Sequence, residues 1–270
     1  MGSLHVDAYY TLSWRGLREQ FVFQKSYPKG IAMSGLANSF AWRTRTKDPN
    51  DPRTRADFHA FLKGRRVLLK AGPHETLAFF VDVCRGQTVL DIGVCAHTDS
   101  YIDDPNWRHK HIAAAASYCM GIDILEDLVK SLAAKGFNIK CVDALSDIDL
   151  GDRFDRVICG DVIEHVNDPV RLLRFAKRHL KPGGSIFVST PNPYSLRVIR
   201  EVLTKGTIVA NFDHVSWYTP SIMNEVAARA ELSLRAYYVF VGSPDPLKNV
   251  LKRIFPAEMQ PLTIVYELGL

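Results

Sequence analysis

Acidic side chains follow three short apolar runs in the middle of the chain, each at the point where the run ends. Asp91 lies in VLDIG just before Gly93, Asp123 ends GIDI, and Asp143 follows in KCVDAL. A carboxylate at the second position can accept hydrogen bonds from both hydroxyls of a ribose, and one at the third can accept from an adenine amino group. A single such Asp usually caps a loop, but three in succession predict a nucleoside-containing ligand.

A fourth apolar run ends in FDRVICGDVIEHV, which places Gly160, Asp161, Glu164 and His165 beyond it. Histidine and carboxylate side chains are good metal ligands, but a metal site needs three or more of them converging in space. Two adjacent residues do not meet that requirement. We therefore expect His165 to pack beside the ligand, and we expect no dependence on a divalent metal.

A further histidine, His214, lies in NFDHVSWYTP, after the fifth apolar run. A neutral imidazole can take a proton from a hydroxyl group, and its ordinary pKa of about 6.5 suits that task. The alternative is that Asp213 and His214 fasten this segment to the body of the protein. Trp217 and Tyr218 could form the wall of a site for a sugar or aromatic ring, although such pairs more often pack in a core.

These side chains can meet only if the apolar runs are strands that end on one edge of a sheet. From about residue 76, short apolar runs alternate with amphipathic segments, a pattern that indicates βαβ units and a parallel sheet with helices on both faces. In such a sheet, ligands bind outside the carboxyl ends of the strands. The predicted strands are 88–92, 118–122, 139–142, 156–159 and 185–189, and the predicted helices are 75–83, 126–135 and 169–180.

The alternation breaks after the fifth strand. Residues 191–216 have an irregular pattern, and Thr219-Pro220 predicts the start of a helix, because Thr is a favourable N-cap and Pro suits the first turn. Two late strands, 236–241 and 262–267, lack a full crossover helix, which favours an antiparallel pair at one edge. We expect a doubly wound, mostly parallel, seven-stranded α/β sheet in which 191–219 form a cap on the substrate side.

Residues 1–75 differ from the rest of the chain. They hold thirteen Lys and Arg against six Asp and Glu, and their apolar residues are too sparse for a separate core. Within them, 57–69 are predicted to be helical. We expect a helical accessory segment, 1–75, that completes the acceptor pocket or an interface between copies of a domain at 76–270. Its dispersed basic residues could face phosphates, but they are more typical of a solvated arm.

The composition of the 270-residue chain, 47% hydrophobic and 23% charged, is that of an ordinary globular protein. No stretch approaches the roughly 18 to 20 consecutive apolar residues that span a bilayer, and the N-terminus lacks the pattern of a signal peptide. The five cysteines are widely spaced without a CxxC pair, which is typical of a reducing compartment. We therefore expect a cytoplasmic protein.

The ordered set VLDIG, GIDI, VDAL, FDRVICGDVIEHV and LKPGGSIFVSTPN resembles the class I S-adenosylmethionine-dependent methyltransferases over roughly residues 76–242. DVIEHV followed by NDPVRLLRFAKRHLKPGG is most similar to the branch that includes ubiquinone-biosynthesis O-methyltransferases and many sugar and polysaccharide methyltransferases. The resemblance implies a Rossmann-like fold, S-adenosyl-L-methionine as cofactor and S-adenosyl-L-homocysteine as product. It also implies methyl transfer to an oxygen of a small molecule or glycan.

The same resemblance implies which residues hold the cofactor. The loop after Asp91 would hold its methionine part, Asp123 its ribose, Asp143 and Ala144 its adenine, and the segment that starts at Gly160 its sulfonium side. The complete set implied for the cofactor is Asp91, Gly93, Val94, Cys95, Asp123, Ile124, Asp143, Ala144, Gly160, Asp161 and Val162. The catalytic candidates are His214 and, second to it, His165.

Two features depart from the family pattern. The family usually has three alternating glycines after the first strand, but here Cys95 and His97 follow Gly93. Glycines let the backbone approach a ligand closely, so this loop must follow another path. The spacing from the first strand to the second is also longer than usual. The extra stretch, 98–116, ends as a predicted apolar helix and either covers the cofactor or forms a surface loop.

Two other functions remain as alternatives. The basic N-terminal segment suggests an RNA or protein methyltransferase, but the chain has no motif of a known RNA-binding module and no Asn-Pro-Pro-aromatic sequence of the kind that amino-methylating relatives carry. The altered glycine loop suggests a non-catalytic binding or scaffold protein. We expect a small-molecule or glycan acceptor rather than a nucleic acid.

Overall fold

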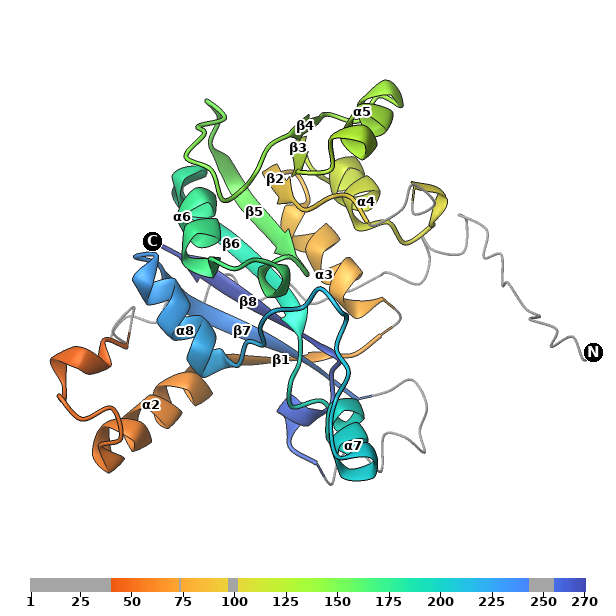
Figure 1. The fold of residues 1–270 in the computed structure, drawn as a ribbon. Coiled ribbons are helices and arrows are strands. Elements are labelled where there is room, and N and C mark those ends of the chain that lie inside the picture. The colour runs from red at the N-terminus through yellow and green to blue at the C-terminus, as the bar shows by residue number, and fades with distance from the viewer. Residues whose placement is uncertain (1–39, 73, 97–101, 243–254) are drawn as a thin grey trace, which may run out of the picture. The chain divides into compact units, whose positions relative to one another are not determined.

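Eight strands form one mixed sheet in the part of the chain that the structure describes, and their order is β1-β7-β8-β6-β5-β2-β3-β4 (Figure 1). This computed structural model describes residues 40–72, 74–96, 102–242 and 255–270. All of them belong to a unit that begins at Asn38. The strands are β1 (Arg66–Lys70), β2 (Thr88–Ile92), β3 (Tyr118–Asp123), β4 (Ile139–Cys141), β5 (Phe154–Gly160), β6 (Leu180–Pro191), β7 (Ser233–Val241) and β8 (Thr263–Gly269).

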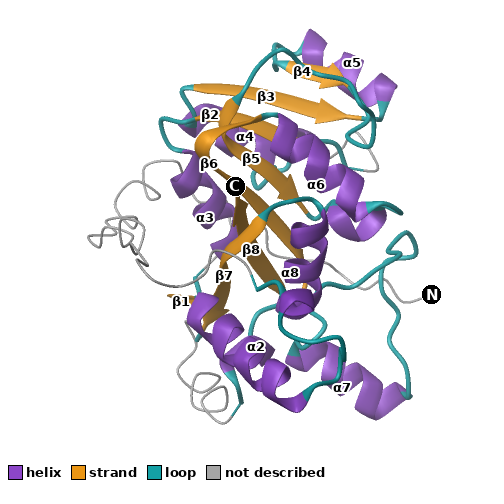
Figure 2. Cartoon of the chain, turned by 90° about the vertical axis from the view of Figure 1, so that its left-hand side faces the viewer, coloured by secondary structure: helices purple, strands orange, loops and turns teal. Residues whose placement is uncertain are grey.

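Helices cover both faces of this sheet (Figure 2). Leu172 of α6 and Met223 of α8 pack with strand residues on one face, and Phe79 of α3 and Ile112 of α4 pack with strand residues on the other. The described helices are α2 (Pro52–Arg65), α3 (Glu75–Cys84), α4 (Arg108–Ala115), α5 (Glu126–Ala134), α6 (Pro169–Arg178), α7 (Leu196–Lys205) and α8 (Pro220–Arg229), with short 3-10 turns η1 (Trp42–Thr44), η3 (Ile163–His165) and η4 (Ala257–Met259).

The central strands are apolar on both sides because helices bury both faces of the sheet. In β2, Val89 contributes to the cluster that contains α3 and α4, whereas Leu90 and Ile92 contribute to the cluster that contains α6 and α8. In β5, Val157 and Ile158 divide between the two clusters in the same way. This alternation fixes the register, so that the strands end on a common edge.

The predicted mostly parallel sheet with an antiparallel pair is confirmed. β8 runs antiparallel to both β6 and β7, while β2, β3, β4, β5 and β6 are joined by parallel pairings. The helix predicted to start at Pro220 is confirmed, and the Thr219 side chain caps it by accepting the Ile222 N–H. The other predicted strands and helices are also present, and the largest difference is that β6 begins earlier, at Leu180.

The predicted number of strands and the helix at 57–69 are corrected by the structure. Helix α2 ends at Arg65, and the next five residues form β1, which pairs parallel to β7 with Val67 opposite Tyr238. The edge of β7 supplies the hydrogen-bond partners that make Arg66–Lys70 a strand, and no local pattern reveals that edge. The sheet therefore has eight strands rather than seven, and the eighth comes from the segment predicted to be accessory.

The cap at 191–219 is less irregular than its pattern indicates, because it contains α7. The Ser195 side chain accepts the Val198 N–H at the start of this helix, and Gly206, with φ of 76°, ends it. None of the residues of α7 is buried. Its apolar residues nevertheless recur at the spacing of an amphipathic helix, at Leu196, Ile199, Val202 and Leu203, so the prediction of an irregular segment overlooked a helical pattern.

None of the described helices has the length and apolar character needed to cross a bilayer. All five cysteines are free thiols. Burial raises the pKa of Cys84 and of Cys119 well above the ordinary thiol range, which keeps both in the neutral form.

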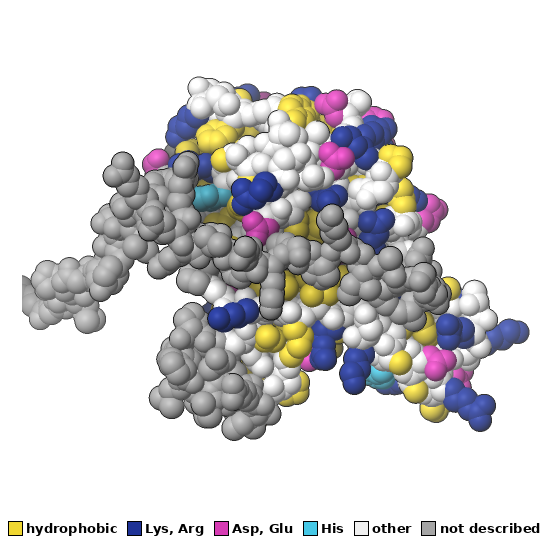
Figure 3. Space-filling model, turned by 180° about the vertical axis from the view of Figure 1, so that it is seen from behind, with side chains coloured by type: hydrophobic (Ala, Val, Ile, Leu, Met, Phe, Trp, Pro, Cys, Tyr) yellow, Lys and Arg dark blue, Asp and Glu magenta, His cyan; other side chains and the backbone are white. Residues whose placement is uncertain are grey.

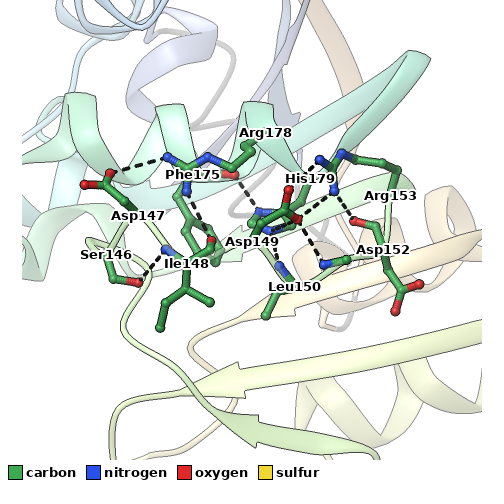
Figure 4. Close-up of polar contacts among 11 residues, drawn as sticks. Ser146, Asp147, Ile148, Asp149, Leu150, Asp152, Arg153, Phe175, Arg178 and His179 are labelled. Atoms are coloured by element: carbon green, nitrogen blue, oxygen red, sulfur yellow. Dashed lines mark hydrogen bonds and ion pairs between the residues drawn. The ribbon is translucent and has the colours of Figure 1, made fainter.

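A buried histidine fixes the segment that leads into β5 (Figure 4). His179 is fully buried; its Nδ1 donates to the Phe175 carbonyl over 2.9 Å and its Nε2 accepts the Leu150 N–H over 3.0 Å. Arg178 donates to the Ile148 carbonyl at 3.1 Å. Burial lowers the pKa of His179, so the neutral ring ties this segment to the end of α6.

We predict that His179→Ala destabilises the fold in a pH-dependent way. At pH 8 the substitution should cost about 1–3 kcal/mol, because two buried hydrogen bonds are lost. The unfolded histidine binds a proton near pH 6.5 and the folded one only at lower pH, so the stability that His179 contributes decreases as pH falls through this range. Urea unfolding at pH 8 and pH 5 should show a smaller loss at pH 5. The exposed His59→Ala is the control, and an equal loss at both pH values would contradict the prediction.

Candidate functional site

The carboxyl ends of β2 and β5 form the crevice in which an open α/β sheet binds its ligand. From β2 the chain crosses to β3 on one side, and from β5 it crosses to β6 on the other. The connections therefore leave these two neighbouring strands in opposite directions, which defines the topological switch point. Gly93 follows β2 and Gly160 ends β5 at this point.

The loop after β2, residues 93–95, turns sharply at its glycine. Gly93 has a φ of 74°, and a Cβ added there would overlap the Cγ2 of Val162. The Gly93 N–H donates to the Ile122 carbonyl of β3 at 2.9 Å. A residue with a side chain at position 93 would strain the backbone and collide with Val162, so Gly93 is needed even though the two later glycines of the family pattern are absent.

Three consecutive residues at the start of α4 hold this loop. Trp107 Nε1 donates to the Val94 carbonyl at 3.0 Å, and Arg108 Nη2 donates to the Gly93 carbonyl at 3.1 Å. His109 Nδ1 pairs with the Asp91 carboxylate at 2.9 Å. We call Trp107, Arg108 and His109 the insert triplet.

The insert triplet belongs to the stretch 98–116 that lengthens the spacing between the first two predicted strands. Its contacts show that the described part of the stretch, from Ile102 onward, covers the β2 loop rather than forming a detached surface loop. His97 lies outside the described residues. Sequence reasoning did not select the triplet, because its partners lie more than ten residues earlier in the chain and no local spacing reveals them.

Asp123 links the β2 loop to the end of β3. Its Oδ2 accepts the Cys95 N–H at 2.8 Å and its Oδ1 accepts the Leu125 N–H at 3.1 Å. The residue is 8% exposed, and each oxygen of an ionised carboxylate can accept a second hydrogen bond. Ile124, the next residue, is 65% exposed.

The turn after β4 lies beside this carboxylate. The Val142 N–H donates to the Asp123 carbonyl at 2.9 Å, and Asp143 Oδ1 accepts the Leu145 N–H at 2.7 Å. Asp143 is exposed and Ala144 is buried. The structure therefore brings the predicted ribose and adenine residues onto one edge of the sheet.

The segment after β5 faces the β2 loop from the other side of the crevice. Asp161 has a φ of 53°, and its N–H donates to the Ser189 carbonyl at 3.0 Å. The Ser189 hydroxyl in turn donates to the Asp161 carboxylate at 3.1 Å. These contacts hold Asp161 in its left-handed conformation and direct Val162 against Gly93.

Glu164, His165 and His214 form a cluster just beyond this segment. One ligand atom from each lies within 4.8 Å of the others, and the two imidazole rings meet edge to face with their centroids 4.6 Å apart. His165 Nδ1 pairs with the Asp213 carboxylate at 3.1 Å, and the Val215 N–H donates to the Glu164 carbonyl at 2.8 Å. The segment 213–215 is thereby held against η3.

The cluster has two chemical capacities. One carboxylate and two imidazoles are a donor set that could hold a divalent cation, and His214 supplies the third donor that the adjacent pair Glu164-His165 lacks. Without a cation, a neutral imidazole in this position can accept a proton. Sequence reasoning considered Glu164 and His165 together but did not join His214 to them, because the contact between η3 and residues 213–215 links distant parts of the chain.

Burial favours the neutral forms of Glu164 and His214. Glu164 is 1% exposed, and neither of its oxygens makes a hydrogen bond of good geometry with a described residue. Burial, with a smaller contribution from Asp161, raises the pKa of Glu164 to about 7, although the Thr190 hydroxyl opposes the shift. Burial and the neighbouring His165 lower the pKa of His214, so His214 is neutral near pH 7.

Of the two aromatic residues beyond His214, Tyr218 packs in the core. It is 2% exposed, its hydroxyl donates to the Ile163 carbonyl at 3.3 Å, and its own carbonyl accepts the Tyr266 hydroxyl at 3.0 Å. Trp217 is half-buried. Tyr218 thus fastens the cap to the body, as the packing alternative expected.

Known proteins with similar sequences are methyltransferases. A family model described as a methyltransferase domain matches residues 68–237. A ubiquinone biosynthesis O-methyltransferase of Methylococcus capsulatus is 31% identical over 136 residues, which cover 46% of this chain and 57% of that protein. One of Coxiella burnetii is 28% identical over 165 residues, which cover 56% of this chain and 65% of that protein. The chain therefore spans less than two thirds of the length of these relatives.

A solved structure agrees with this family at the level of the fold. The S-adenosylmethionine-dependent methyltransferase of Archaeoglobus fulgidus is similar with a TM-score of 0.50 and 18% identity, covering 72% of this chain and 91% of that one. The family model covers more than half of the chain, and its span includes the crevice, the insert triplet and the histidine cluster. The chain therefore belongs to the methyltransferase-domain family and has a Rossmann-like fold.

Proposed function

We propose that this enzyme transfers the methyl group of S-adenosylmethionine to a hydroxyl oxygen of a small molecule or glycan. The observation that carries the proposal is the neutral His214, held beside Glu164 and His165 at the end of the crevice. An amine acceptor can be methylated without a base of this kind, whereas a hydroxyl group must lose its proton. The curated relatives, which are named as O-methyltransferases, also support an oxygen acceptor.

The proposed reaction is an in-line displacement. The acceptor oxygen forms a bond to the methyl carbon, the bond from that carbon to sulfur breaks, and the sulfur keeps the electron pair, leaving S-adenosylhomocysteine. The hydroxyl proton passes to a ring nitrogen of His214. The main contribution of the protein is to hold the oxygen and the methyl carbon in attacking geometry, while His214 keeps the developing charge on the oxygen low.

The proposed cofactor position follows the edge of the sheet. The β2 loop would hold the methionine part of the cofactor, and Asp123 would hold the ribose. Asp143 and Ala144 would flank the adenine, and the segment 160–162 would line the sulfonium side. The contacts that join Asp123 both to the β2 loop and to the turn after β4 support this order. The residues before α3 and the cap with α7 would then shape the acceptor site.

The described residues add no observation in favour of the RNA or protein alternative, which rests on the basic N-terminal segment alone. On the face that Figure 3 shows, Lys and Arg side chains are dispersed among Asp, Glu and apolar ones rather than gathered into a continuous basic surface. Binding to RNA through its phosphates would need such a surface and would weaken steeply with salt. Methyl transfer that requires RNA and declines with salt would favour this alternative over our proposal.

We predict that Asp123→Ala weakens the binding of S-adenosylhomocysteine at least tenfold, about 1.4 kcal/mol. The substitution removes the acceptors for the ribose hydroxyls and also releases the Cys95 N–H. Calorimetric titration measures the effect, with the exposed Asp127→Ala of α5 as the control. An unchanged affinity in a folded Asp123→Ala protein would remove Asp123 from the site.

We predict that His214→Ala lowers kcat by about 10²–10⁴-fold and leaves cofactor affinity unchanged. Because burial lowers the pKa of His214, wild-type activity should rise with pH to a plateau, with an apparent pKa below the ordinary imidazole value. S-Adenosylhomocysteine release, measured with a panel of phenolic and sugar acceptors, reports both quantities.

Two outcomes would contradict the base role of His214. A lower melting temperature and raised KM with an intact kcat would make the residue a structural tether. Activity that EDTA abolishes and Mg²⁺ or Mn²⁺ restores would show that Glu164, His165 and His214 hold a cation, and the cation would then activate the hydroxyl instead.

We predict that Glu164→Gln stabilises the protein above neutral pH by roughly 1–3 kcal/mol. Glu164 has a pKa of about 7 in the folded protein and an ordinary carboxyl pKa when unfolded, so the wild type loses stability as pH rises from about 4.5 to 7. Glutamine does not ionise and escapes this loss. Urea unfolding in EDTA should show a gain at pH 8 that nearly disappears at pH 5. Glu126→Gln, on the exposed side of α5, should show no such gain.

A further inference from the structure

The insert triplet places a guanidinium group inside the crevice between β2 and β5. Arg108 Nη2 donates to the Gly93 carbonyl at 3.1 Å and Nη1 donates to the Gly160 carbonyl at 3.0 Å. A Cβ on Gly160 would overlap this guanidinium, and the Arg108 Cζ lies 6.0 Å from the centroid of the Phe80 ring. Arg108 therefore lies directly over both strand ends that define the switch point.

The surroundings of Arg108 carry two carboxylates. Asp91 Oδ1 lies 3.8 Å from Arg108 Nε, and Asp161 Oδ2 lies 3.9 Å from Nη1. Asp91 is fully buried, and neither its Oδ1 nor the Arg108 Nε makes a hydrogen bond to a described residue. A buried carboxylate without a cation nearby is costly. Arg108 therefore compensates the charge of Asp91 through its buried Nε, while one N–H group on each of Nη1 and Nη2 makes no contact to Gly93 or Gly160.

The Arg108 side chain is also partly exposed. Its side chain is 20% exposed, whereas that of His109, the next residue, is 1% exposed. A guanidinium has five N–H donors in a planar fork, and only two of them donate in the contacts to Gly93 and Gly160. Such a fork matches a carboxylate with two parallel hydrogen bonds.

We propose that Arg108 binds the α-carboxylate of the methionine part of S-adenosylmethionine, an inference that rests on the proposed position of that part at the β2 loop. The methionine end of the cofactor carries one carboxylate and one ammonium group. The carbonyls of Gly93 and Gly160 and the carboxylates of Asp91 and Asp161 are acceptors that suit the ammonium, and Arg108 is the cation among them that suits the carboxylate. The insert thus supplies a cofactor contact from outside the altered glycine loop.

Binding of three ligands by calorimetry tests this assignment. S-Adenosylhomocysteine carries both the carboxylate and the ammonium group. Decarboxylated S-adenosylmethionine keeps the ammonium group but has no carboxylate, and 5′-methylthioadenosine has neither. Arg108→Met should weaken the binding of S-adenosylhomocysteine at least tenfold and should change the affinity for the other two ligands less than twofold. Arg108→Lys keeps the charge without the fork and should give an intermediate loss for S-adenosylhomocysteine alone.

The control is Arg235→Met. Arg235 likewise covers a glycine, Gly269, and donates to the Gly184 carbonyl at 2.8 Å, but it lies near the start of β7, at the opposite end of the sheet. This variant should bind all three ligands as the wild type does.

Two results would overturn the assignment. Equal weakening of all three ligands by Arg108→Met would show that Arg108 only supports the β2 loop, and an unchanged affinity for S-adenosylhomocysteine would show that it makes no contact. The lysine variant keeps the assignment testable if the methionine variant does not fold. Asp123→Ala should weaken the binding of all three ligands alike, because each carries the ribose. If Asp123→Ala has this effect and Arg108→Met does not have its own, the inference about Arg108 is overturned and the proposed function stands.

Discussion

The close approach of backbone at the ends of β2 and β5 is the constraint on which the site depends. A side chain at Gly93 would strain the backbone and collide with Val162, and one at Gly160 would displace the Arg108 guanidinium. The two glycines expose their carbonyls to the same group, the Arg108 guanidinium, so backbone acceptors line the crevice together with the side chains around it. The left-handed conformation of Asp161 belongs to the same arrangement, because it directs Val162 against Gly93.

The insert triplet holds the β2 loop, which lacks two of the glycines of the family pattern. A loop with Cys95 in place of a small residue needs partners to hold its path, and the insert triplet gives one bond to each of three successive parts of the segment, the Asp91 carboxylate and the carbonyls of Gly93 and Val94. The same residues compensate a fully buried carboxylate, since a buried charge must be paired to be tolerated. In this chain, residues of the stretch that lengthens the connection between β2 and β3 thus hold the altered loop.

The sequence predicts those features of the fold and the site that depend on residues close together in the chain. Alternating apolar runs locate the strands, and the carboxylates at Asp91, Asp123 and Asp143 mark where they end, because both signals lie within a few residues of each other. The eighth strand was missed because Arg66–Lys70 becomes a strand only through the edge of β7. The insert triplet and the joining of His214 to Glu164 were missed for the same reason: each depends on contacts between segments far apart in the chain. Helix α7 was missed although Leu196, Ile199 and Val202 follow a helical spacing, because the whole segment was predicted to be irregular.

The central claim is that S-adenosylmethionine lies along the edge formed by β2, β3 and β5 with its sulfur toward the histidine cluster. A crystal structure of the complex with S-adenosylhomocysteine tests it most directly. Our account predicts ribose hydroxyls about 2.5–3.0 Å from the Asp123 carboxylate. It also predicts a sulfur atom beside Val162, with the side that carries the methyl group in S-adenosylmethionine facing His214. A nucleoside bound elsewhere, or a sulfur that faces away from His214 with Asp123 still bonded only to the backbone, would contradict it.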